Sequence, residues 1–248
     1  MKEENDTAPF IFNALDLRIQ GIFAVLSPED YHLSQKGESI MRESAAAMEN
    51  VRSTRPDRVR FIAVTGIFSA IAFVLMFLEF PIPMLIPPFI KFDFSDIPAL
   101  LGAFAMGPLC GILVELIKNI LHVTTSGSFG VGELSNFLLG AVFTGVAGFI
   151  YMRKKTKKTA LIASVTGALA MALISVVSNY FIVYPVYYNF MPEETILAAY
   201  QAILPSVKSI LQSLLVFNLP FTFAKGMIDV LVTFLIYKPL SPLLKGRR

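Results

Sequence analysis

Charged and amide side chains recur at helical spacing inside otherwise apolar stretches of this sequence. Glu115, Lys118, Asn119 and His122 occupy positions i, i+3, i+4 and i+7, which places them on one face of a helix. Ionisable groups are costly inside a membrane, where they usually pair or mark a functional site. We therefore expect Glu115 and Lys118 to pair as opposite charges, and His122 to make a polar contact at the helix end.

A second polar set has residue types suited to holding a polar ligand. Thr222, Lys225 and Asp229 follow the spacing i, i+3 and i+7, and Asn136 opens another apolar run. An asparagine amide offers a donor and an acceptor, and a lysine ammonium offers donors. Lys225 and Asp229 could instead pair with each other at i and i+4. For Asn136 and Lys225 we favour ligand binding, because both are expected at helix starts that face the same loops.

Residues for catalysis or metal binding are scarce. His32 and His122 are the only histidines, and His32 lies in a polar N-terminal region, so a zinc site built from several histidines is not available. Cys110 is the only cysteine, which excludes disulfides and cysteine-based metal sites within one chain. The sequence contains no Gly-x-Ser-x-Gly elbow and no ATP-binding loop. We predict that the protein is not an enzyme and holds no cofactor.

The polar residues sit in a strongly apolar chain. Hydrophobic residues make up 55% and charged residues 16%, whereas soluble domains average about 25% charged. Most apolar runs approach the roughly 20 residues that a membrane-spanning helix needs, and the net charge of +3 is too small to indicate nucleic-acid binding. We predict an all-α, multi-pass protein of the cell membrane, surrounded by lipid. The runs are Phe61–Phe80, Ile97–Leu121, Leu134–Met152, Ala160–Val183 and Phe221–Tyr237.

Basic residues predict the orientation. Arginines precede the first run, five basic residues lie within Arg153–Lys158, and the chain closes with Lys245, Arg247 and Arg248. All three groups should be cytoplasmic. That requires the second run to break at Gly107–Gly111, where Gly and Pro favour a turn. Six transmembrane helices result, with both termini cytoplasmic.

The predicted organisation has two parts. Residues 1–57 form a polar cytoplasmic extension without a cleavable signal peptide, and residues 58–248 form the membrane domain. Pro81–Phe94 is expected to cap an outward-facing pocket. Tyr184–Pro220 is expected outside the membrane, with its own helix starting at Pro192. The tyrosines at 180, 184, 187 and 188 are expected to form an interfacial belt.

Four segments are informative in combination: Phe92–Gly102, Gly107–Asn119, Gly132–Asn136 and Pro220–Gly226. Together they resemble the riboflavin-specific S component of energy-coupling factor (ECF) transporters, over roughly Arg58–Leu240. The resemblance implies a six-helix subunit that binds riboflavin from outside, with FMN as a further candidate. It also implies docking to a transmembrane T component and two ATPase subunits. Riboflavin would be the transported substrate rather than a cofactor.

The resemblance also implies site residues. The ligand-contacting asparagine and lysine of the family map to Asn136 and Lys225, and the first-loop contacts map to Phe89 and Lys91. Thr222 stands where many relatives have a second asparagine. Riboflavin has a flat ring with an imide edge, which amide and ammonium groups can bind, while Met84, Leu85 and Phe89 are expected to cover the ring faces.

The first helix would present small residues to the T component. The candidates are Ala63, Gly66, Ser69 and Ala70, where Gly66 departs from the family's Ala-x-x-x-Ala pattern but still permits close helix approach. Three alternatives remain open: an S component for another small vitamin, an intramembrane enzyme using Glu115, Glu133 or Asp229, and a scaffold without ligand.

Overall fold

The computed structural model of the chain describes residues 28–127 and 129–244. The chain divides into two compact units, Met1–Val59 and Arg60–Arg248. The described part of the first unit is helical throughout and belongs to α2 (Pro28–Met76), which continues into the second unit. Part of the predicted N-terminal extension, residues 1–27, lies outside the described residues.

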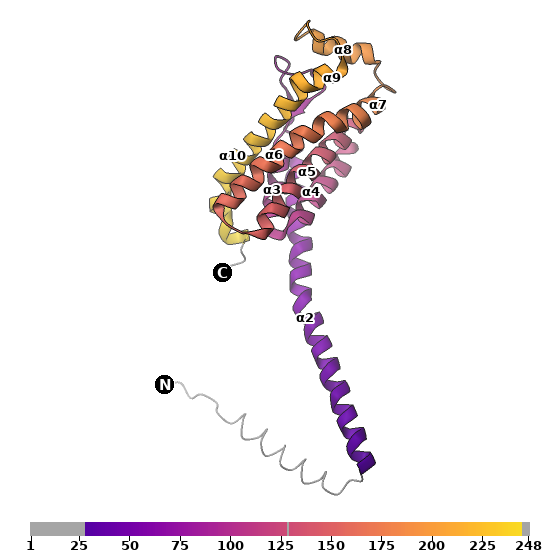
Figure 1. Cartoon of the computed structure of the whole chain (residues 1–248), viewed down its shortest axis with the longest axis vertical. Helices are drawn as coiled ribbons and strands as arrows, with labels where there is room; N and C mark the ends of the chain where they lie inside the picture. The colour runs from indigo at the N-terminus through magenta and orange to yellow at the C-terminus, as the bar shows by residue number, and fades with distance from the viewer. Residues whose placement is uncertain (1–27, 128, 245–248) are drawn as a thin grey trace. The chain divides into compact units, whose positions relative to one another are not determined.

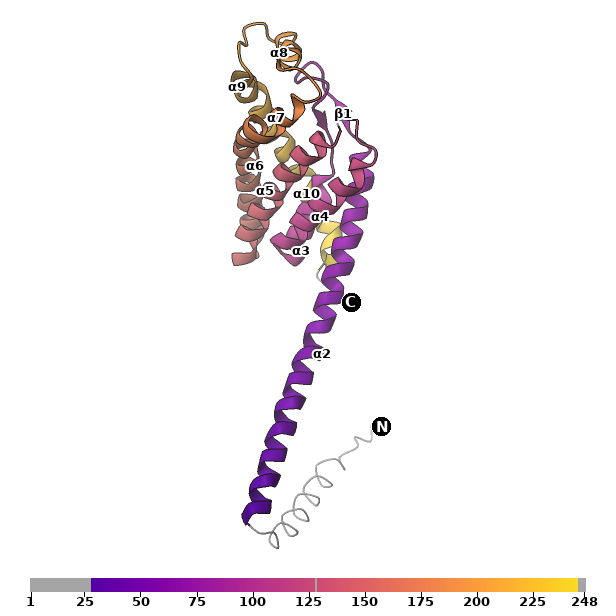
Figure 2. The same cartoon turned by 90° about the vertical axis from the view of Figure 1, so that its right-hand side faces the viewer.

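The second unit is built almost entirely from helices (Figures 1 and 2). After α2, a short antiparallel hairpin pairs β1 (Phe80–Pro81) with β2 (Lys91–Phe92). The remaining elements follow in chain order: α3 (Asp96–Met106), α4 (Pro108–Val123), α5 (Val131–Arg153), α6 (Lys157–Ser178), η1 (Asn179–Val183), α7 (Tyr184–Tyr187), α8 (Glu193–Gln201), α9 (Ile210–Ser213), η2 (Leu214–Asn218) and α10 (Leu219–Leu244).

The helices of this unit pack side by side. Helix α5 contacts α4 and α6, α6 also contacts α10, and α3 contacts α4, α5 and α10. One buried cluster joins Leu100, Phe143, Met171 and Val230 from α3, α5, α6 and α10. A second cluster joins Phe68 and other α2 residues to α3 and α4. Buried apolar side chains thus hold α3 at the centre of the bundle.

The break between α3 and α4 occurs at Gly107. Its φ of 100° is unfavourable for residues with a side chain, and Pro108 follows in the first turn of α4. This confirms the predicted helix break at Gly107–Gly111. The resulting helices have 11 and 16 residues.

The region Tyr184–Pro220 is more helical than predicted. Helix α8 begins directly after Pro192, as expected, but α6 continues through η1 into α7, and the last long helix starts at Ile210 instead of Phe221. Both π-helical segments, η1 and η2, end two residues before a proline, Pro185 and Pro220. A proline has no N–H for the helical hydrogen bond, and its ring crowds the carbonyl of the residue four positions earlier. A wider π turn accommodates the ring. The prolines therefore lie within these helices and do not end them.

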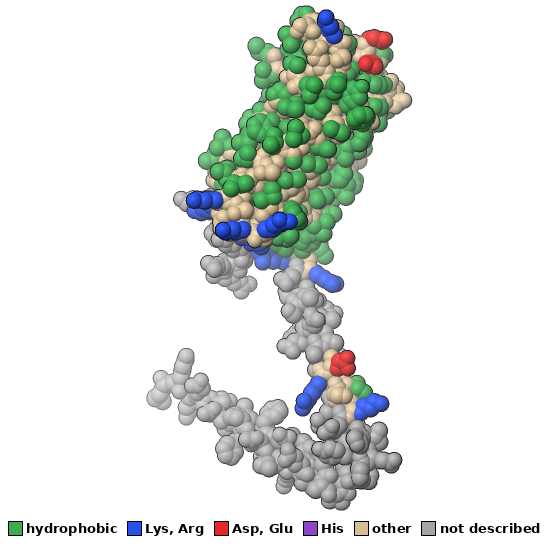
Figure 3. Space-filling view, in the orientation of Figure 1, with side chains coloured by type: hydrophobic (Ala, Val, Ile, Leu, Met, Phe, Trp, Pro, Cys, Tyr) green, Lys and Arg blue, Asp and Glu red, His purple; other side chains and the backbone are tan. Residues whose placement is uncertain are grey.

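Four helical stretches among the described residues are long and apolar enough to cross a membrane. They are Arg58–Met76, Val131–Arg153, Lys157–Tyr187 and Ile210–Ile236. Hydrophobic side chains cover much of the helical surface in view, and Lys and Arg side chains gather at one of its ends (Figure 3). Phe181, on the η1 segment, is 70% exposed despite its large apolar ring. Such a surface suits contact with lipid.

Candidate ligand-binding site

A cavity of about 250 Å³ lies between the first loop and the neighbouring ends of the long helices. This volume is slightly below the range of roughly 300–1,000 Å³ seen for small-molecule sites. Its wall combines apolar and aromatic side chains with amides and charged groups. The lining residues include Phe89, Lys91, Asp93, Asp96, Ser135, Asn136, Leu139, Met171, Asn179, Tyr184, Tyr187, Asn218, Thr222 and Lys225.

The structure brings five of the predicted ligand residues to this cavity. Phe89 and Lys91 come from the first loop, Asn136 from the start of α5, and Thr222 and Lys225 from α10. Asn136 lines the cavity, and its amide makes no side-chain hydrogen bond with any other described residue, so its donor and its acceptor are both available to a ligand. These residues lie up to 136 positions apart in the sequence, as Phe89 and Lys225 do.

Met84 and Leu85 do not line the cavity. Their side chains are 87% and 61% exposed, in the turn region between β1 and β2. The aromatic side of the cavity comes instead from Phe89, whose ring centroid lies 6.1 Å from those of both Tyr187 and Tyr200. The first loop and α8 therefore meet around one phenylalanine.

The hairpin carries its own ion pair. Lys91, in β2, pairs with Glu79, which immediately precedes β1. Both side chains are partly exposed and both residues line the cavity. An exposed pair of this kind contributes little stability. The Lys91 ammonium has three donors and gives one to Glu79, so this lining residue keeps donors for a ligand.

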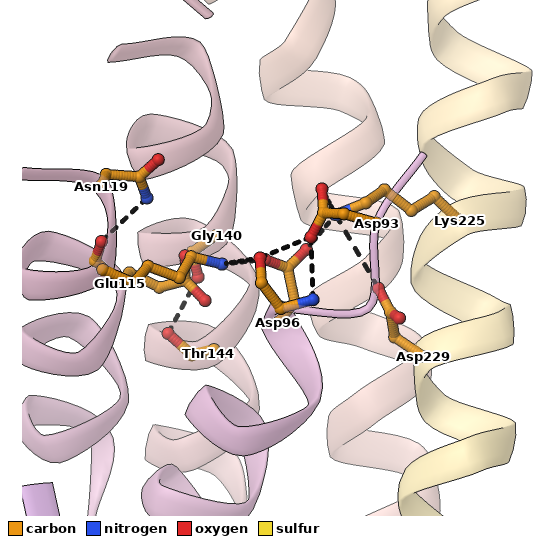
Figure 4. A network of polar contacts seen from close by, with 10 residues as sticks. Asp93, Asp96, Glu115, Asn119, Gly140, Thr144, Lys225 and Asp229 are labelled. Atoms are coloured by element: carbon orange, nitrogen blue, oxygen red, sulfur yellow. Dashed lines mark hydrogen bonds and ion pairs between the residues drawn. The ribbon is translucent and has the colours of Figure 1, made fainter. Parts of the chain in front are cut away.

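Lys225 lies beside three carboxylates (Figure 4). Its Nζ is 2.5 Å from Asp96 Oδ2, 3.5 Å from Asp93 Oδ2 and 4.0 Å from Asp229 Oδ2. The pairing with Asp229 that its i, i+4 spacing allows is thus the longest of the three. Because the ammonium is already compensated, it suits a neutral hydrogen-bond acceptor better than an anion.

Lys118 and Glu115 pair as predicted, at 2.7 Å between Nζ and Oε2. Lys118 is fully buried and also donates to Asp96 Oδ1 at 2.6 Å and to Ser95 Oγ at 2.7 Å. The Glu115 carboxylate lies against Gly140 of α5, where any side chain would overlap it. Neither Lys118 nor Glu115 lines the cavity, so this pair belongs to the interior of the bundle.

His122 makes the expected contact at the end of its helix. Its Nδ1 lies 2.8 Å from Glu133 Oε1, and Ser126 Oγ donates to Glu133 Oε2 at 2.7 Å. This set links the end of α4 to the start of α5.

Two asparagines that the sequence analysis did not select also line the cavity. Asn179 opens η1 and Asn218 closes η2. Ser135 Oγ donates to Asn179 Oδ1 at 3.3 Å, and the Tyr200 hydroxyl donates to Asn218 Oδ1 at 2.6 Å. Because their oxygens are engaged, the groups that these two lining amides retain for a ligand are their N–H donors. In the sequence, both asparagines lie near the ends of apolar runs and close to a proline, and this pattern could have identified them as candidate site residues.

The predicted aromatic belt is wrong for two of its four tyrosines. Tyr184 and Tyr187 are buried and line the cavity, and the Tyr184 hydroxyl contacts that of Tyr200. Helix α7 turns them inward because it continues α6 instead of leaving the bundle. Burial raises the pKa of Tyr200 well above its ordinary value, so its hydroxyl stays protonated and able to donate.

The predicted docking residues divide between two faces of α2. Ala63, Gly66 and Ala70 are exposed, and a Cβ added at Gly66 would meet none of the described neighbouring atoms within 4 Å. Ser69 is 2% exposed and points into the bundle. The exposed small residues follow the spacing i, i+3 and i+7, which is one helix face.

The chain is similar to proteins of one transporter family. The family model described as "ECF transporter, substrate-specific component" matches residues 60–237. The riboflavin transporter RibU of Staphylococcus aureus is 37% identical, with the match covering 80% of this chain and 99% of the relative. The riboflavin transporter FmnP of Bacillus subtilis is 32% identical, covering 77% of this chain and 97% of the relative.

A solved structure has the same fold. It is described as the S component of a bacterial ECF transporter, and it superposes with a TM-score of 0.61 at 34% sequence identity. The match covers 76% of this chain and 99% of the solved chain.

Proposed function

Because the chain belongs to the substrate-specific components of ECF transporters, we propose that it binds riboflavin and delivers it for uptake into the cell. The chain is a multi-pass protein of the cell membrane. One observation carries the proposal: a single cavity combines the Asn136 amide, which has no side-chain partner among the described residues, with the Lys225 ammonium and an aromatic wall.

The cavity chemistry matches the two sides of a flavin ring. Phe89, Leu139, Met171 and Tyr187 supply apolar and aromatic surface for the flat faces. Asn136 can pair with an imide edge, which alternates acceptors and donors. The engaged oxygens of Asn179 and Asn218 leave N–H groups for carbonyl or hydroxyl oxygens.

The electrostatics favour a neutral ligand edge near Lys225. Three carboxylates already surround its ammonium, and a phosphate placed there would meet them as like charges. The uncharged ring of riboflavin avoids this repulsion. A phosphate group, as in FMN, would have to point away from Lys225.

The proposed arrangement in the membrane has six spans. Four spans are the long stretches, and α3 and α4 are the other two. Each of these two helices is too short to cross alone, and both pack among the other helices. The exposed basic residues of Arg153–Lys158 then mark the cytoplasmic side. By this orientation the cavity opens outward, beneath the first loop and α8.

Energy for uptake would come from partner subunits. The proposed partners are a T component and two ATPase subunits of an ECF module, with Ala63, Gly66 and Ala70 as the docking face. Small residues allow close helix packing in a membrane, and their exposure within this chain leaves them available for it.

The direct test is titration of the purified protein with riboflavin, followed by quenching of flavin fluorescence. We expect saturable binding at one site and a yellow preparation when riboflavin is present during purification. FMN and other small vitamins serve as competitors. Failure of riboflavin to bind, or stronger binding of an unrelated vitamin, would refute the assigned substrate.

A further inference from the structure

The acidic motif Phe92–Asp96 lies directly before and at the start of α3. Asp93 Oδ1 accepts hydrogen bonds from the Ser95 backbone N–H, at 2.8 Å, and from the Ser95 hydroxyl. This turn sets the start of α3 and places Asp96 in its first turn. A helix N-terminus favours a negative charge there.

Asp96 joins two lysines from distant parts of the chain. Its Oδ1 accepts from Lys118 at 2.6 Å and its Oδ2 accepts from Lys225 at 2.5 Å. The Asp96 residue is 1% exposed, and each of its two carboxylate oxygens is held by a different lysine. It therefore cannot rotate away from Lys225 without breaking the contact with Lys118.

Lys225 differs from Lys118 in being partly exposed at the cavity. Its side chain is 11% exposed and lines the cavity, whereas Lys118 is fully enclosed. An ammonium has three N–H donors, and the pairing with Asp96 uses one of them. A lysine without a close counter-ion in such a site would lose its charge or extend toward water.

We propose that Asp96 is the positioning residue for Lys225. Its carboxylate holds the ammonium at the cavity wall with a donor directed at the ligand, and Lys118 in turn holds the carboxylate. The inference rests on the proposed riboflavin site and adds a residue that acts on the ligand through another side chain. Asp93 and Asp229 lie farther from Nζ, at 3.5 and 4.0 Å, and contribute charge rather than position.

A double-mutant cycle tests this assignment. Riboflavin affinity is measured by fluorescence titration for the parent, Asp96→Asn, Lys225→Ala and the double variant. We expect Asp96→Asn to weaken binding about tenfold or more in the parent, and less than about twofold once Lys225 is alanine. An equal loss in both backgrounds, or no loss in either, would overturn the proposal.

Two matched variants separate the positioning of Lys225 by Asp96 from a general effect of negative charge and from a loss of folding. Asp229→Asn makes the same chemical change beside the same lysine, but at 4.0 Å and away from the cavity, so its loss of affinity should be clearly smaller than that of Asp96→Asn. A loss as large as that of Asp96→Asn would show a general charge effect and overturn the proposal. Where Asp96→Asn does not fold, Asp96→Glu enters the same cycle, because it keeps the charge but moves the oxygens.

A ligand-free measurement keeps this test separate from the proposed function. Thermal unfolding of the same four proteins without riboflavin should show non-additive losses for Asp96 and Lys225, since the two side chains are in contact. If the parent does not bind riboflavin but this coupling is present, the proposed substrate fails and the Asp96–Lys225 positioning stands. Additive losses would overturn the positioning itself.

Discussion

The hydroxyl of Tyr200, in α8, donates to the side-chain oxygen of Asn218 at 2.6 Å. Tyr200 is fully buried, and Asn218 lies at the end of a π-helical segment that borders the cavity. Helix α8, outside the long apolar helices, thus holds the side-chain oxygen of an amide that lines the cavity. The loop between α7 and α9 takes part in the site and does more than connect two spans.

Replacing Tyr200 by Phe should reduce stability and riboflavin affinity, although Tyr200 lies outside the long apolar helices. The change removes the donor to Asn218 and the contact with Tyr184 while keeping the ring beside Phe89. We expect a loss of about 1–2 kcal/mol of unfolding free energy and a severalfold loss of riboflavin affinity. Thermal unfolding and fluorescence titration provide the two measurements.

Tyr180→Phe is the control for that variant. Its side chain is 43% exposed and does not line the cavity, so both stability and affinity should match the parent. If Tyr200→Phe also binds riboflavin like the parent, α8 does not orient the amide.

Lys225→Ala and Asn136→Ala should each weaken riboflavin binding. Each change leaves a ligand carbonyl or N–H without its partner, which costs about 1–3 kcal/mol, or roughly ten- to a hundredfold in affinity. The lysine should give the larger loss, because hydrogen bonds from charged donors are stronger. Titration by flavin fluorescence measures both.

Lys118→Ala is the contrasting variant. Lys118 contacts Glu115, Ser95 and Asp96 but not the cavity, so its loss should mainly reduce thermal stability and should affect binding only indirectly, through Asp96, and less than Lys225→Ala does. Parent-like binding by both Lys225→Ala and Asn136→Ala would place the ligand elsewhere.

Gly66→Leu should abolish most riboflavin uptake by cells while purified protein keeps its affinity. A Cβ added at Gly66 has no described neighbour within 4 Å outside its own helix turn, so we expect the leucine to disturb mainly a partner that packs closely against the small-residue face. Uptake of labelled riboflavin and titration of purified protein are compared. Ile67→Leu, at a neighbouring exposed position, is the control and should keep uptake.

A loss of riboflavin binding in purified Gly66→Leu would argue against a docking role. Gly66 would then belong to the fold or the cavity. Ser69 is not part of this test, because it is buried inside the bundle.

The proposed orientation predicts which loops face outward. With buried Cys110 replaced by Ala, single cysteines at Ser126 and Thr156 are treated with a membrane-impermeant thiol reagent on intact cells. We expect labelling at position 126 and none at position 156, because the basic residues around Thr156 favour the cytoplasm. The opposite pattern would rule out six spans with cytoplasmic termini.

The sequence by itself determined the features that depend on near neighbours. Apolar run length indicated membrane helices, Gly107 followed by Pro108 indicated the break between α3 and α4, and the i, i+3 spacing paired Glu115 with Lys118. These are local effects of backbone geometry and helix periodicity. The family motifs then selected Asn136, Thr222 and Lys225, which the structure brings to one cavity.

Only the tertiary structure decided which distant groups meet. Asp96 and Lys225 are 129 positions apart, and no periodicity relates them, so their contact depends on how α3 packs against α10. The positions of Tyr184 and Asn218 at the cavity likewise depend on how the helices pack. Local backbone preference predicts that a helix ends near a proline. Here π-helical turns beside Pro185 and Pro220 let the helices continue, because packing in the bundle outweighs that preference.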